Sequence, residues 1–485
     1  MAPLHLIDTT FRDGQQCNWA TRMSTAAMLP AAEDLDRAGF GAIEVIGAVQ
    51  FDAAVRYLSE NPWERLRQLR TRITRTPMQA VIRSSCILGF EPQHEDINRL
   101  WVERLFANGC TRFVAFDGLH DLDNVVPALL HAKSLGAMTT GWLTFSDSPI
   151  HTDELYAQKA REFIDRADVD ALLIEDASGV LTPERLRTLV PAIRAEIGEM
   201  SLGLHSHGVV GLPQRSYLAA AELGVDNLYT CVPPVADSNA PPSVLTTLRN
   251  LRAAGHAIDM DIASLERVSH HLDQVSIAEG RPQGRVMDFD AAAVGHQVPG
   301  GVMSNLEAQL DQVGLHHKLP EVLEECARVR ADLGWPIQVT PFAQFIGVQA
   351  TLNVINGDRY AVVPDEVKKY AMGHYGKTLA PVVPNVLDRI LENGSAYIHE
   401  PPKMLEPVLP GLRTKYPDLN DETRMLRYFF DGAMVDRMER SAERSTMLRT
   451  PIVAAMELAC SGRNVSRVVL DKGDFHLELR KRPGT

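Results

Sequence analysis

The chain has 485 residues, of which 45% are hydrophobic and 23% charged, an ordinary composition for a globular protein with a large core. Its net charge of −13 argues against a nucleic-acid-binding surface, and no segment approaches the ~20 consecutive apolar residues of a transmembrane helix. The six cysteines form no CxxC pair, so we expect a reduced, cytoplasmic protein rather than a disulfide framework or a zinc module.

Short apolar and β-branched runs alternate with segments of helical periodicity through the first half of the chain. The helical segments include Thr21–Ala38, Asn98–Ala107 and Pro183–Ile197. Eight such units in about 240 residues predict a (β/α)8 TIM barrel. A doubly wound sheet is the competing fold, but it would carry a Gly-rich turn after its first strand, where this chain has Asp8-Thr-Thr-Phe-Arg-Asp13. The predicted strands are Leu4–Thr10, Ala42–Gly47, Met78–Arg83, Thr111–Asp117, Ala137–Phe145, Ala171–Asp176, Leu202–His207 and Asn227–Val232.

The alternation stops after about residue 245, and residues 260–440 carry mainly helical patterns. Near the end of the chain, alternating apolar residues flank Lys472-Gly473-Asp474, which predicts a hairpin. We therefore expect a barrel over residues 1–280, a mainly helical domain over 281–440 and a tail over 441–485.

Polar side chains gather at the carboxyl ends of the predicted strands, where barrel enzymes carry their active sites. His205 and His207 lie two residues apart on one strand, so both imidazoles face the same side. Together with a carboxylate they would suit a divalent transition metal, although they would also serve as hydrogen-bonding residues inside the barrel. Arg83 would either bind an anion or close a salt bridge. The remaining polar residues at these ends are Arg12, Asp13, Asp117, Glu175, Asp176, Asp237, Ser238 and Asn239.

Several motifs occur in a familiar order along residues 4–415. They are Asp8–Gln16 followed by Ala20–Met23, Phe51-Asp52 with Pro62–Leu66, Met78-Gln79 through Arg83, Leu204–His207, Val298–Leu306, Val339–Pro341 through Gln349, and Tyr370–Gly376. This series resembles the biotin-dependent carboxyltransferases, which include the carboxyltransferase domain of pyruvate carboxylase, the oxaloacetate decarboxylase α-subunit and the transcarboxylase 5S subunit.

The resemblance implies a metal-dependent barrel whose mouth is capped by a helical funnel. The family moves a carboxyl group between carboxybiotin and a small 2-oxo acid such as pyruvate or oxaloacetate, through an enolate. By position, Asp13, His205 and His207 match ligands of a divalent metal ion (Zn, Mn or Co), and Gln16, Arg83 and Arg12 match substrate-binding residues. Ser238 falls where the family has a threonine that shuttles a proton to and from biotin, which makes Ser238 a catalytic candidate alongside Gln16 and Arg83.

Partners follow from the same resemblance. No Met-Lys-Met biotinylation motif is present, so biotin would arrive on a separate biotin carboxyl carrier protein that is charged by a biotin carboxylase subunit. A homodimer is expected, a nucleic acid is not an expected partner, and no transmembrane segment is expected.

Departures from the family pattern leave alternatives open. The family's fourth ligand, a carboxylated lysine, is replaced by Glu175, which is shorter and would ligate only after a shift of the metal or through water. Val114 stands where the family has an arginine, and the run Pro233–Pro242 is also unusual. A biotin-independent lyase or aldol-type condensing enzyme and a catalytically silent scaffold are therefore the alternative functions.

Overall fold

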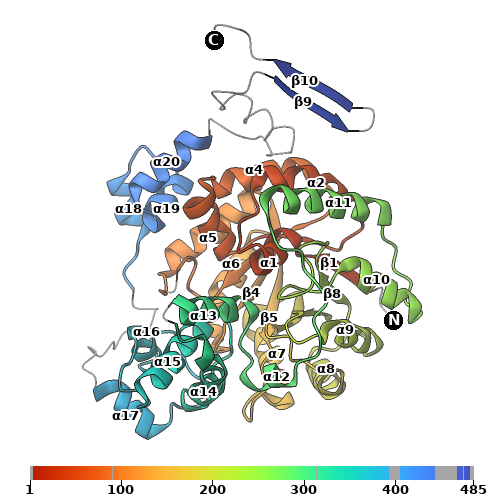
Figure 1. The fold of residues 1–485 in the computed structure, drawn as a ribbon. Helices are drawn as coiled ribbons and strands as arrows, with labels where there is room; N and C mark the ends of the chain where they lie inside the picture. The colour runs from red at the N-terminus through yellow and green to blue at the C-terminus, as the bar shows by residue number, and fades with distance from the viewer. Residues whose placement is uncertain are drawn as a thin grey trace.

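The computed structural model describes residues 4–89, 91–312, 314–392, 405–442, 467–472 and 475–480. Eight parallel strands close into a barrel in chain order, because β1 pairs with β8 as well as with β2 (Figure 1). This closure confirms the predicted (β/α)8 fold. The strands are β1 (His5–Asp8), β2 (Ile43–Ile46), β3 (Met78–Arg83), β4 (Cys110–Phe116), β5 (Met138–Thr144), β6 (Ala171–Asp176), β7 (Ser201–Ser206) and β8 (Asn227–Thr230).

The helices that surround the barrel begin at identifiable caps. Thr182 caps α8 through its side chain, as its sequence context predicts. Helix α2 begins four residues later than predicted, because Ala20 and Thr21 take left-handed φ angles and Ser24 provides the cap. The helices of this part are α1 (Gln15–Asn18), α2 (Thr25–Arg37), α3 (Ala48–Ala53), α4 (Pro62–Arg72), α5 (Glu95–Ala107), α6 (Val126–Ser134), α7 (Asp153–Ala167), α8 (Pro183–Ile197), α9 (Pro213–Glu222), α10 (Val244–Ala253) and α11 (Ile262–Glu279), with π-helices η1 (Thr10–Gly14) and η2 (Ala54–Leu58) and the 3-10 helix η3 (Leu122–Asn124).

Alternation along the strands decides which side chains face the barrel axis. Ile7, Val81, Trp142 and Tyr229 belong to an apolar cluster inside the barrel. Their outward neighbours pack instead in the larger core between the strands and the surrounding helices. By the same alternation, the side chains of Arg83 on β3, Glu175 on β6 and His205 on β7 point toward the mouth of the barrel.

The helical part after the barrel packs in two groups. Helices α13 to α17 form a core of their own, separate from the barrel core. Helices α18 to α20 join the outer core of the barrel instead, where Phe430 stacks on Phe51. The bounds are α12 (Ala291–His296), α13 (Gly300–Gln312), η4 (His316–Lys318), α14 (Leu319–Asp332), α15 (Phe342–Asn356), α16 (Asp365–Ala371), α17 (Pro384–Glu392), α18 (Leu409–Lys415), α19 (Asp421–Phe429) and α20 (Gly432–Ala442). The domain limits at residues 280 and 440 stay predictions.

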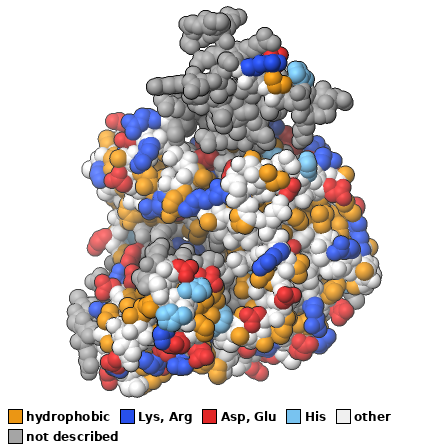
Figure 2. Space-filling view, viewed as in Figure 1, with side chains coloured by type: hydrophobic (Ala, Val, Ile, Leu, Met, Phe, Trp, Pro, Cys, Tyr) orange, Lys and Arg blue, Asp and Glu red, His pale blue; other side chains and the backbone are white. Residues whose placement is uncertain are grey.

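Two strands near the chain end, β9 (Arg467–Lys472) and β10 (Phe475–Arg480), pair antiparallel, and the intervening Gly473-Asp474 lies outside the described residues. On the face seen in Figure 2, Lys and Arg side chains are interspersed with Asp and Glu. Within the described ranges, no helix combines the length and apolarity that crossing a membrane requires.

Candidate active site

Asp13 is carried by the π-helix η1, which starts directly after β1. The carbonyl oxygen of Thr9 accepts hydrogen bonds from the backbone N–H groups of Arg12, Asp13 and Gly14. The Thr9 hydroxyl also accepts from the Asp13 N–H at 3.3 Å. This cap turns the chain sharply at the end of β1 and leaves the Asp13 carboxylate buried at the mouth of the barrel.

Asp13, His205 and His207 converge on one point. The Asp13 Oδ2 atom lies 2.9 Å from the Nε2 atom of each histidine, and the two Nε2 atoms are 3.1 Å apart. All three side chains are buried. The structure thus brings together the three residues that the sequence predicts as ligands.

The protonation of this triangle is constrained by its surroundings. The Asn239 carbonyl oxygen accepts a hydrogen bond from His207 Nδ1 at 2.7 Å, so His207 Nε2 is the nitrogen that faces the cluster. Burial disfavours the imidazolium form and lowers the pKa of His205. At His207 burial acts in the same direction, but the Asp13 carboxylate outweighs it and raises the pKa well above its usual value. Burial opposes ionisation of Asp13 as well, yet Arg12 and His207 hold its pKa well below the usual range.

This donor set fits a divalent transition metal. Two imidazole nitrogens and a carboxylate oxygen are the ligands that zinc, manganese and cobalt accept. Neighbouring ligands at about 2.1 Å from an octahedral ion lie roughly 3 Å apart, which matches the separations within the triangle. Among the described residues, this is the group of three or more His, Cys, Asp or Glu whose ligand atoms all lie within 4.8 Å of one another.

Glu175 lies on β6 at the register of His205, but it is not part of that group. Its carboxyl is buried, and burial together with the charges of Asp13 and Asp176 raises its pKa to about 8. Asp176 faces away from the mouth and accepts hydrogen bonds from the N–H groups of Val180 and Leu181. A direct bond from Glu175 to a metal therefore stays a prediction.

Arg12 and Gln16 lie next to the triangle. Arg12 donates from Nη1 to Asp13 and from Nε to Glu44, and its buried Nη2 has no hydrogen-bond partner among the described residues. Gln16 is half-buried, and its amide oxygen accepts from Gln50 at 2.9 Å, which leaves its NH2 group as a donor. Both side chains thus retain donors of the kind that bind a carboxylate or a carbonyl oxygen.

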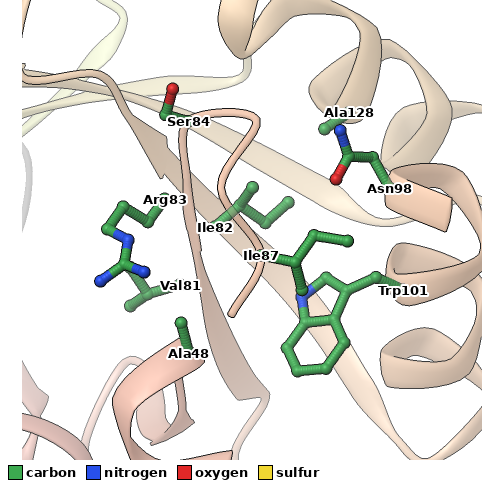
Figure 3. A pocket seen from close by; sticks show the side chains of 9 residues that line it. All are labelled: Ala48, Val81, Ile82, Arg83, Ser84, Ile87, Asn98, Trp101 and Ala128. Carbon is green, nitrogen blue, oxygen red and sulfur yellow. The ribbon is translucent and has the colours of Figure 1, made fainter. Parts of the chain in front are cut away.

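Arg83 ends β3 and lies on the same side of the strand as Val81, opposite Ile87 and Trp101 (Figure 3). Burial lowers the pKa of its guanidinium. Its Nη2 atom donates to the carbonyl oxygen of Gly89 in the loop that follows the strand. The side chain is therefore at the predicted rim, with one of its donors bound to its own loop.

Ser238 follows β8 and is engaged by the segment that leads from α11 to α12. Its hydroxyl accepts from the backbone N–H of Arg285 at 2.9 Å and lies 3.3 Å from the Arg285 carbonyl oxygen. The Ser238 N–H also donates to that carbonyl oxygen. The structure does not bring this hydroxyl into the three-residue cluster, so its catalytic role stays a prediction.

Two neighbours of the cluster were not predicted. Glu44 binds both Thr9 and Arg12, and Cys17 lies 3.6 Å from Asp13 Oδ1. The signal for Glu44 is a single acidic residue within the otherwise apolar strand Ile43–Ile46, since a buried carboxylate needs partners. No comparable signal marks Cys17.

Known proteins that are similar to this chain are carboxylases and their subunits. The family described as "Conserved carboxylase domain" matches residues 294–476. A pyruvate carboxylase subunit of Methanocaldococcus jannaschii is 38% identical over 390 residues, which cover 80% of this chain and 68% of that protein. The protein of the same name from Methanothermobacter thermautotrophicus is 33% identical over 489 residues, covering 99% of this chain and 84% of that protein.

Solved structures show the same fold. The carboxyl transferase domain of Rhizobium etli pyruvate carboxylase, in a structure with pyruvate, superposes with a TM-score of 0.87 at 21% identity. That superposition covers 99% of this chain and 83% of the other.

Proposed function

The chain belongs to the family of biotin-dependent carboxyltransferases, and on this premise we propose that it moves a carboxyl group between carboxybiotin on a separate carrier protein and a small 2-oxo acid. Pyruvate and oxaloacetate are the proposed pair, and a biotin carboxylase subunit is the proposed source of the carboxyl group. The observation that carries the proposal is the buried triangle of Asp13, His205 and His207 at the barrel mouth.

The reaction needs an enolate of the 2-oxo acid. The C–N bond of carboxybiotin breaks, a C–C bond forms at C3 of pyruvate, and the C3 proton passes to the ureido nitrogen of biotin. Negative charge develops on the ketone oxygen, and a divalent cation held by the triangle would supply Lewis-acid stabilisation there.

The side chains at the rim take the remaining roles in this proposal. Arg12 offers its buried Nη2 donor and Gln16 its NH2 group to the acid's carboxylate and carbonyl oxygen. Arg83 would join them by exchanging its bond to Gly89 for one to the substrate. Ser238 would carry the proton to biotin, which requires its hydroxyl to release the Arg285 backbone.

Metal content and carboxyl transfer are tested on one preparation. The purified chain is assayed for bound Zn, Mn and Co, and then for biocytin-dependent decarboxylation of oxaloacetate, with pyruvate measured through lactate dehydrogenase. We expect one divalent ion per chain, activity only with biocytin, and loss of both in His205→Asn and His207→Asn. His271, which contacts the Ala27 carbonyl oxygen away from the site, provides the matched control His271→Asn.

Each outcome decides between the candidate functions. A metal-free chain with unchanged decarboxylation in both histidine variants would refute the metal site. Decarboxylation that does not need biocytin would point to the biotin-independent lyase, and an inactive, metal-free chain would point to the scaffold. Carboxylation from supplied carboxybiotin, run once with pyruvate and once with 2-oxoglutarate, identifies the acceptor.

A further inference from the structure

We propose that Glu44 is a positioning residue of the metal site, which acts on Asp13 through Thr9 and Arg12. The inference rests on the proposed function, since it concerns the ligand that this function assigns to the metal. Glu44 lies on β2 and is fully buried, and its hydrogen-bond partners among the described residues are Thr9, Arg12 and Gln79 and not the two histidines.

The two carboxylate oxygens of Glu44 have different partners. Oε2 accepts from the Thr9 hydroxyl at 2.6 Å and from Arg12 Nε at 2.5 Å. Oε1 accepts from Gln79 Nε2 at 3.0 Å. One oxygen therefore faces the residues that hold Asp13, and the other faces the interior of the barrel.

Both contacts of Oε2 lead to Asp13. The Thr9 hydroxyl that donates to Glu44 accepts from the Asp13 N–H, which fixes the start of η1. The Arg12 guanidinium that Glu44 holds donates from Nη1 to Asp13 Oδ1 at 2.9 Å. Asp13 Oδ1 is thereby occupied, and Oδ2 is the oxygen directed to the two histidines.

The charges give Glu44 a second effect. Arg12 lies between two carboxylates, because its Nη1 atom donates to Asp13 and its Nε atom donates to Glu44. If Glu44 were neutral, Asp13 would be the nearest counter-charge of a buried guanidinium, and less of its charge would be available to a cation. Glu44 thus shares the Arg12 guanidinium with Asp13 and adds a negative charge beside the cluster.

The test measures metal affinity rather than turnover. Mn²⁺ binding to the chelator-stripped full chain is titrated by electron paramagnetic resonance of free Mn²⁺. Glu44→Gln keeps the shape of the side chain, and Gln79 can turn its amide, because its Oε1 has no hydrogen-bond partner among the described residues. We expect the Mn²⁺ dissociation constant to rise about tenfold to a hundredfold while the thermal midpoint stays close to that of the wild type.

Gln79→Met is the matched control, since it removes the contact to Oε1 and leaves both contacts of Oε2 in place. We expect its Mn²⁺ affinity to stay within about threefold of the wild type. The double variant Glu44→Gln/Arg12→Met tests whether the two residues are coupled. If Glu44 acts through Arg12, Arg12→Met should weaken Mn²⁺ binding less in the Glu44→Gln background than in the wild type.

The outcomes separate this inference from the function on which it rests. A wild-type chain without Mn²⁺ binding overturns both, whereas equal affinities of wild type, Glu44→Gln and Gln79→Met overturn the inference alone. If Glu44→Gln does not fold, Thr9→Val takes its place, because it removes the hydroxyl that links Glu44 to the Asp13 N–H. Unchanged affinity in that variant likewise overturns the inference.

Discussion

Gly179→Ala should disturb the candidate site, because a side chain at this position would overlap the backbone of His207. Gly179 follows β6 at φ +68°, and a Cβ there would lie closer than 3.0 Å to the carbonyl oxygen of His207, with the His207 carbonyl carbon at 3.2 Å. Both obstructing atoms are backbone, so no side-chain rotation relieves the overlap. The N–H groups of Gly179 and His207 also share the Asp176 carbonyl oxygen, which ties the two segments together.

The expected loss in the free energy of unfolding has two contributions. An alanine held at a left-handed φ costs about 1 kcal/mol relative to glycine. Displacing packed backbone adds about 1–3 kcal/mol, the usual cost of overpacking. We therefore expect Gly179→Ala to lower the free energy of unfolding by about 2–4 kcal/mol and to shift the backbone that carries the His207 imidazole.

Gly280→Ala is the matched control. Gly280 ends α11 at φ +63°, and a Cβ there meets no atom within 4 Å, so this variant carries the backbone cost without the overlap. Both variants are unfolded in urea and titrated with Mn²⁺. Gly179→Ala should be the less stable by about 1–3 kcal/mol and should alone bind Mn²⁺ more weakly. Equal stability and equal affinity of the two variants would refute the steric argument.

Three further changes test other parts of the structure. Burial lowers the pKa of His120 to about 3, while a histidine in the unfolded chain keeps a pKa of about 6.5. Because only the unfolded chain binds the extra proton, the free energy of unfolding should fall by about 2 kcal/mol between pH 6.5 and pH 5 on account of this residue. Urea unfolding of His120→Asn should lack that loss. Glu175→Ala should reduce Mn²⁺ affinity about tenfold, and unchanged Mn²⁺ titrations would show that Glu175 is not a ligand. Phe51→Ala removes the ring that contacts Trp63 and Phe430 and should lower the free energy of unfolding in urea by about 3–5 kcal/mol. The control Phe289→Ala, at an exposed position, should lower it by less than about 0.5 kcal/mol. Similar losses in the two variants would contradict this packing.

The barrel was predictable because its signal is local and repeated. Each strand is a short apolar run, and the period of two within it also indicates which polar residue faces the mouth. His205 lies on β7 and His207 follows directly after the strand, and both Nε2 atoms meet Asp13. On β6 it is Glu175, and not Asp176, that pairs in register with His205. The π-helix that places Asp13 was not predicted, since the five residues Thr10–Gly14 carry no distinctive periodicity.

The partners of rim side chains depend on segments far away in the sequence. The Ser238 hydroxyl accepts a hydrogen bond from the backbone N–H of Arg285, and no sequence pattern near either residue predicts that contact. Arg83 binds Gly89 because the loop after β3 folds back over the strand end. A rim position can thus be predicted from a strand, whereas the contacts of the side chain follow from loop paths that only the three-dimensional structure provides.

Val114 is one of the positions at which the sequence departs from the family pattern. It is buried in the apolar cluster inside the barrel with Val81 and Trp142, so the β4 wall presents no cation at this position. The guanidinium groups at the rim that the sequence predicted come from Arg12, which follows β1, and from Arg83 at the end of β3. Under the proposed function, an acid's carboxylate would be held from the β1 and β3 side of the mouth, where Glu44 on β2 accepts a hydrogen bond from Arg12.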